Sequence, residues 1–108
     1  MLDQSAGPKE PTKSPTESGK DEILRVGGGT DAKKLAASIV ISINKGARPL
    51  VEYIGAGAGQ QAIKAIALAS TTLSRAGQYL SVVPVFISRQ LPDAVVTGIQ
   101  LRVIIHNL

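Results

Sequence analysis

Short apolar runs alternate with amphipathic segments of helical length from Ile23 onward, and this alternation restricts the chain to a small α/β fold. The runs Ile23–Val26 and Leu50–Ile54 predict strands, and the glycine-rich segments Gly27–Gly29 and Gly55–Gly59 end them. A segment of helical length follows each glycine-rich segment. Two such strand–helix units with right-handed crossovers place both helices on one face of a sheet.

The first helix is predicted over residues 31–44, because apolar side chains recur there every fourth residue. Leu35, Ile39 and Ile43 should therefore face the sheet, and Thr30 is expected as the N-cap.

The second helix is predicted over residues 60–76 and is rich in alanine. Its inner face is expected to comprise Ile63, Ile66, Ala67, Ser70 and Leu73. Its outward stripe comprises Lys64, Leu68, Thr71, Thr72 and Arg75. A leucine within a polar stripe indicates contact with a partner, so the predicted dimer interface is Leu68, Thr72 and Arg75.

Two further strands are predicted near the C-terminal end, over residues 79–87 and 99–106, with an eleven-residue connection between them. Pro84 interrupts the first of these strands and indicates an edge or a bulge. The order is βαβαββ, which is a two-layer α/β sandwich with a mixed four-stranded sheet. A domain of this size gains stability from dimerising.

The charge is distributed unevenly along the chain. Residues 1–22 hold three lysines and five carboxylates, whereas residues 23–108 hold nine basic groups and three carboxylates. The net charges are therefore −2 and +6. The first segment is rich in proline and polar residues, so a disordered tail is expected over 1–22 and a folded domain over 23–108. A basic domain of this kind attracts polyanions, above all nucleic acid.

Composition argues against several functional classes. The chain has no cysteine and one histidine, and no Ser/His/Asp arrangement or metal-ligand spacing is apparent. No apolar run reaches the length of a membrane span, and the N-terminus lacks the pattern of a signal peptide. We therefore expect a cytoplasmic protein that is not an enzyme and uses no metal, cofactor, small-molecule substrate or membrane.

Residues 27–32, GGGTDA, have the spacing of a dinucleotide-binding loop, and Glu52 lies 23 residues after Gly29. A dinucleotide fold needs more strands and a second nucleotide half. A tight glycine turn between strand and helix is the preferred interpretation.

Lys33 and Lys34 fall in the first turn of the first helix, where cations oppose the helix dipole. Beside unpaired backbone N–H groups they form a candidate phosphate site, the alternative being an ordinary solvated turn. A second candidate is the loop Gly55–Gly59, which is followed by Gln60, Gln61 and Lys64.

Residues 54–58, IGAGA, and 61–69, QAIKAIALA, resemble the stage V sporulation protein S family, whose pattern here is close to I-G-A-G-A-x-x-Q-A-V-K-A-V-A-I-A. The resemblance extends from about Glu22 to the C-terminus. It implies an Alba-like fold and a homodimer that binds DNA or RNA. The regions it implies for binding are the start of the first helix, the loop before the second helix with Lys64, and a long hairpin arm centred on Arg89.

The sequence therefore predicts an Alba-like protein that binds nucleic acid through backbone phosphates with weak sequence preference, nucleoid-associated if bacterial. The predicted contacts are Lys33, Lys34, Gln60, Gln61, Lys64 and Arg89. DNA and RNA both stay open, as does a role as a developmental or sporulation-type regulator. The alternative function is a protein-interaction or homo-oligomeric assembly module without nucleic-acid binding.

Overall fold

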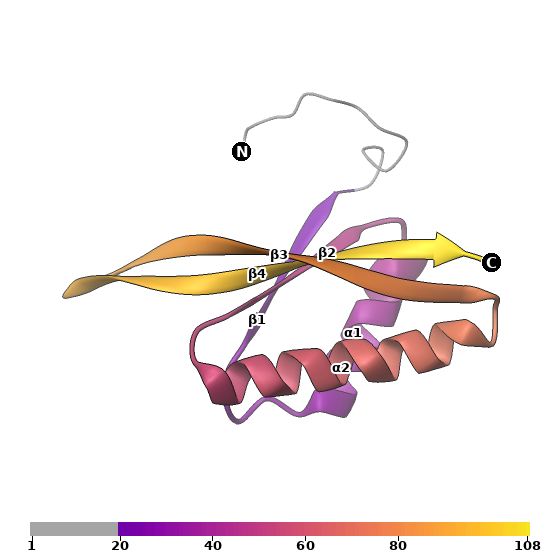
Figure 1. Ribbon diagram of the computed structural model, residues 1–108, viewed down its shortest axis with the longest axis horizontal. Helices are drawn as coiled ribbons and strands as arrows, with labels where there is room; N and C mark the ends of the chain where they lie inside the picture. The colour runs from indigo at the N-terminus through magenta and orange to yellow at the C-terminus, as the bar shows by residue number, and fades with distance from the viewer. Residues whose placement is uncertain (1–19) are drawn as a thin grey trace.

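Two strand–helix units followed by a β-hairpin form a two-layer α/β sandwich in the computed structural model, which describes residues 20–108 (Figure 1). Both helices lie on one side of a mixed four-stranded sheet, so the predicted βαβαββ fold is confirmed. The strand order is β1-β2-β4-β3, with β1 parallel to β2 and β4 antiparallel to both its neighbours. The elements are β1 (Asp21–Val26), α1 (Ala32–Asn44), β2 (Arg48–Tyr53), α2 (Ala56–Ser74), β3 (Gln78–Leu91) and β4 (Ala94–Asn107).

Charged residues begin both parallel strands, and hydropathy alone does not mark them. β1 starts at Asp21 and β2 at Arg48, each two residues before the predicted start. Arg48 Nη2 lies 2.7 Å from Asp21 Oδ1, and the Arg48 N–H donates to the carbonyl of Lys20. The predicted tail, residues 1–22, lies outside the described residues except for its last three, and two of these belong to β1.

Asp31, rather than the predicted Thr30, is the N-cap of α1. Its carboxylate accepts hydrogen bonds from the N–H groups of Lys33 at 2.8 Å and Lys34 at 3.3 Å. The Thr30 hydroxyl instead accepts a bond from the Gly27 N–H and closes the turn after β1. Leu35 and Ile39 are buried as predicted, whereas Ile43 is only half-buried.

Small residues form the buried side of α2, and this differs from the prediction. The helix begins at Ala56 rather than Gln60, so most of the predicted glycine loop is its first turn. A Cβ atom at Gly59 would lie 2.5 Å from the ring of Tyr53, so only glycine allows this close approach to the sheet. Ile63 is 51% exposed and Ala67 is also exposed, so the predicted inner face is wrong at both positions. The buried residues are Ala58, Gly59, Ala62, Ala65, Ile66, Ala69 and Leu73.

The predicted eleven-residue connection is instead mostly strand. β3 and β4 pair without interruption, from the pair of Gln78 with Asn107 to the pair of Leu91 with Ala94. Only Pro92 and Asp93 are left in the turn between them. The last pair between β2 and β4 joins Tyr53 to Ile99. Residues 87–98 therefore project beyond the sheet as a two-stranded hairpin arm, the length of which agrees with the family resemblance (Figure 1).

The two faces of the sheet differ in what covers them. Val51, Leu101 and Val103 are buried against the helices and form the centre of the core. Their strand neighbours Glu52, Gln100 and Arg102 point the other way, because side chains alternate along a strand. We call this second side the open face, because no helix in residues 20–108 covers it.

Candidate nucleic-acid interface

Both helices begin at the same end of the molecule. The carboxyl ends of the parallel strands β1 and β2 lie together, and each strand leads directly into a helix. The Gln61 side-chain amide donates to the carbonyl of Thr30 at 2.7 Å and so ties the start of α2 to the start of α1. The hairpin arm projects towards this same end (Figure 1). We call this region the helix-start end.

Three predicted phosphate contacts are exposed on the two helices. Lys33 and Lys34 lie in the first turn of α1, whereas Lys64 lies in the third turn of α2, because that helix begins at Ala56. Ion pairs among residues 20–108 involve Arg25, Lys45, Arg48 and Arg89, and none of these three lysines. The lysine ammonium groups are therefore available to an anion on this part of the surface.

The start of α2 adds a favourable backbone environment for an anion. Its N-cap is Gly55, with a φ of 92°, and no side chain caps the helix. The first turn consists of alanine and glycine only and has no acidic residue, so no carboxylate neutralises the positive end of the helix dipole there. Of the two predicted glutamine contacts, Gln60 is exposed, whereas Gln61 is half-buried and its side-chain amide donates to the Thr30 carbonyl.

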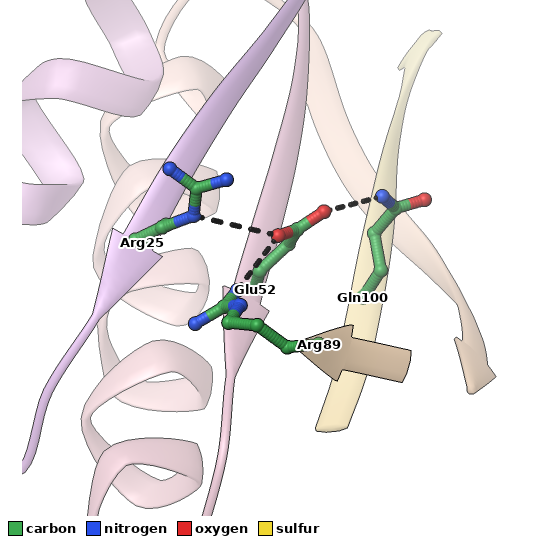
Figure 2. A network of polar contacts seen from close by, with 4 residues as sticks. All are labelled: Arg25, Glu52, Arg89 and Gln100. Atoms are coloured by element: carbon green, nitrogen blue, oxygen red, sulfur yellow. Dashed lines mark hydrogen bonds and ion pairs between the residues drawn. The ribbon is translucent and has the colours of Figure 1, made fainter. Parts of the chain in front are cut away.

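Arg89, the predicted contact in the arm, turns back towards the sheet. Its Nη2 lies 2.9 Å from Glu52 Oε1, and its side chain is 27% exposed (Figure 2). Glu52 Oε2 accepts a hydrogen bond of 2.7 Å from the Gln100 side-chain amide. Arg25 Nε lies 3.8 Å from Glu52 Oε1. Arg102 extends the network by donating to Gln100 Oε1 at 3.0 Å.

Sequence reasoning missed Glu52 as the centre of this network. Its side chain is only 8% exposed, although it lies on the open face. The available signal was a single carboxylate within an otherwise apolar strand, because a buried carboxylate needs partners. The same contacts occupy both carboxylate oxygens, so Glu52 is not free to serve as the acidic residue of a dinucleotide site.

The predicted dimer residues lie in two places. Leu68 and Thr72 line a groove of about 490 Å³ between the outer surfaces of α1 and α2. The remaining lining residues are Lys33, Ala36, Ala37, Val40, Ile41 and Thr71. Arg75 is instead the C-cap of α2 and is not part of the groove lining. The groove therefore connects the predicted dimer surface to Lys33.

Residues 20–108 contain no group of three metal-ligating side chains arranged to hold a metal ion. None of the helices described is both long enough and apolar enough to span a membrane.

The sequence model of the family described as Stage V sporulation protein S (SpoVS) matches residues 22–106. This match covers nearly all of the sheet and both helices. Comparison with curated proteins gives no match.

Proposed function

Since the chain belongs to the stage V sporulation protein S family, we propose that it serves a sporulation-type developmental process by binding nucleic acid. The binding is non-enzymatic and uses the helix-start end to contact backbone phosphates. The observation that carries this proposal is the exposure of Lys33 and Lys34 at the start of α1, which Gln61 ties to α2, a helix whose own N-terminus has no side-chain cap. Lys64 lies two turns further along α2.

The chemistry of this end favours phosphate over base recognition. Lysines and helix N–H groups bind phosphate oxygens, which carry no sequence information. The first turns of α1 and α2 contain no aromatic side chain, so their lysines and N–H groups offer contacts to phosphates rather than to bases. We therefore propose weak sequence preference, with both DNA and RNA accepted.

Salt dependence tests the proposal directly. If the three lysines neutralise about three phosphates, the logarithm of the association constant should fall with the logarithm of salt concentration at a slope near −3 per protomer. Fluorescence anisotropy with a labelled duplex between about 50 and 200 mM salt measures this slope. Affinity that stays constant across this range would contradict phosphate contacts as the basis of binding.

Self-association is a second proposed property, and the groove between the helices favours it. Leu68 is 40% exposed and Ile41 is 60% exposed, although both line the groove. Exposed apolar side chains gathered in a groove mark an interaction surface. We propose that a second copy of the chain covers this groove in a homodimer. This surface also supports the alternative function, an assembly module that does not bind nucleic acid.

Leu68→Asp should shift the protein from dimer towards monomer in sedimentation velocity. Burial of one leucine contributes roughly 1.5–3 kcal/mol, and a two-fold axis counts each contact twice. Ile63→Asp is the matched control, because Ile63 is also exposed on α2 but does not line the groove. Equal dimer dissociation constants for both variants would place the interface elsewhere.

A further inference from the structure

Arginine and lysine are segregated on this molecule. Four of the five arginines, Arg25, Arg48, Arg89 and Arg102, lie on strands. Their cross-strand partners on this face are, in the same order, Glu52, Asp21, Val96 and Val83. By contrast, Lys33, Lys34 and Lys64 lie on the helices. The open face is thus a second basic surface, on the side of the sheet opposite the helices.

The open face carries an excess of positive charge. Its four guanidinium groups are matched by two carboxylates, those of Asp21 and Glu52. Asp21 is paired closely with Arg48, and Glu52 with Arg89, at 2.7 and 2.9 Å. Arg25 lies further from Glu52, with 3.8 Å between Arg25 Nε and Glu52 Oε1, and its side chain is 67% exposed. Arg102 is exposed and donates a hydrogen bond to the neutral side chain of Gln100. Arg25 and Arg102 therefore present donors to an incoming anion.

An aromatic pair lies further along the same face. The rings of Tyr79 and His106 are stacked with centroids 4.7 Å apart, and Tyr79 is half-exposed. The Ser81 hydroxyl lies 2.7 Å from His106 Nε2 and holds the imidazole in place. His106 follows Arg102 by four residues on β4, a separation of about 13 Å along an extended strand.

Half-exposed aliphatic side chains surround Arg102 on the open face, and one of them, Ile104, separates it from the rings. Ile23, Val83 and Ile104 each keep two-fifths to half of their surface exposed. The cross-strand pairs Leu50–Arg102 and Val83–Arg102 place Arg102 directly among these apolar groups. The open face therefore combines flat guanidinium groups, an exposed aromatic ring and an apolar floor.

We propose that the open face binds single-stranded nucleic acid, with phosphates on Arg25 and Arg102 and a base stacked on Tyr79. This inference deepens the proposed function, on which it rests, by giving the chain a separate site for unpaired strands. Unpaired bases can stack on aromatic and guanidinium planes, whereas the bases of a duplex are already stacked on one another. Lysines at the helix-start end act as point charges and suit the phosphates of either form.

The test compares two probes and two variants of the full chain. The probes are a thymidine homopolymer oligonucleotide and a DNA duplex of equal phosphate number. The first variant, Arg25→Gln with Arg102→Gln, should weaken single-strand binding by at least about tenfold and duplex binding by less than about twofold. Its matched control, Lys45→Gln with Arg75→Gln, removes two charges away from the open face and should change neither affinity by more than about twofold.

Tyr79→Leu is the second variant and retains the charge and the apolar volume. It should weaken single-strand binding by roughly fivefold to a hundredfold, as loss of one stacking partner does. The only other tyrosine is Tyr53, on the helix face, where its ring packs against Gly59. The part of the tyrosine fluorescence quenching by the single strand that is lost in Tyr79→Leu therefore reports on Tyr79, and this part should be the larger.

The outcomes separate this inference from the proposed function. Unchanged single-strand affinity in both open-face variants overturns the inference and leaves the helix-start end as the only site. Equal competition by polyglutamate of matched charge also overturns it, in favour of an acidic protein partner. A wild-type protein that binds neither probe overturns the proposed function itself.

Discussion

Replacing Lys33, Lys34 and Lys64 together by glutamate should lower the affinity for duplex DNA by about a hundredfold or more at low salt. Each substitution removes a phosphate contact and adds a repulsive charge at the helix-start end. The slope of the logarithm of the association constant against the logarithm of salt concentration should also become less negative, by about three, because about three counterions are no longer released. Fluorescence anisotropy with the duplex measures both effects.

This loss should not reflect unfolding. The three lysines are exposed, and glutamates at positions 33 and 34 lie in the first turn of α1, where acidic residues interact favourably with the helix dipole. The melting temperature should therefore stay within a few degrees of the wild-type value. Arg75→Glu is the control, since it reverses a charge at the opposite end of α2. Duplex affinity in the triple variant within about twofold of wild type would contradict the helix-start end as the binding site.

Glu52→Ala should lower the free energy of unfolding by about 2–3 kcal/mol. Removing one partner from a buried ion pair typically costs about 3–5 kcal/mol, because the other charge is left without compensation. The effect is smaller here because both arginine partners reach solvent and can be rehydrated, Arg89 with 27% and Arg25 with 67% of its side chain exposed. A loss of this size lowers the melting temperature by about 10–20 °C in a domain of this length. Urea unfolding followed by circular dichroism measures the free energy.

Asp21→Ala is the matched control for Glu52→Ala. Both carboxylates lie on the open face and pair with an arginine at similar distances, 2.7 Å for Asp21 and 2.9 Å for Glu52. The Asp21 side chain is 47% exposed, so its loss should cost less than about 1 kcal/mol. Equal destabilisation by the two substitutions would show that burial of the Glu52 network contributes nothing beyond a surface pair. Amide exchange in residues 87–98 should also rise in Glu52→Ala alone, since Glu52 anchors Arg89 of the arm.

The element order and the sheet could be predicted because they depend on periodicities that the core imposes. Predicted boundaries failed where that periodicity is absent. Alanine and glycine at residues 56–59 are compatible with a loop and with the first turn of a helix. In the structure this turn packs against the ring of Tyr53, a contact that only glycine at position 59 allows and that no local pattern predicts. The hairpin arm lacks a covered face, so its strands show no alternation between apolar and polar residues.

The candidate site could be predicted where it follows from topology. Parallel strands that each lead into a helix bring the first turns of α1 and α2, and with them Lys33, to one end, and this follows from the order of elements alone. The contact between Glu52 and Arg89 joins residues 37 positions apart and depends on the register of three strands. Register of this kind is set by the pairing of the whole sheet rather than by any local pattern.

The strand order also constrains how the chain can fold while it is being synthesised. β4 is the last of the six elements to leave the ribosome, yet it lies between β2 and β3 in the sheet. Until it emerges, β2 has β1 on one side only and β3 has no neighbour, so both expose unpaired edges to other nascent chains. Pro84 removes one backbone donor within β3 and reduces the capacity of that strand to pair wrongly during this interval. Pairing of β4 is therefore the step that completes the native sheet, because β4 supplies the second neighbour of β2 and the neighbour of β3.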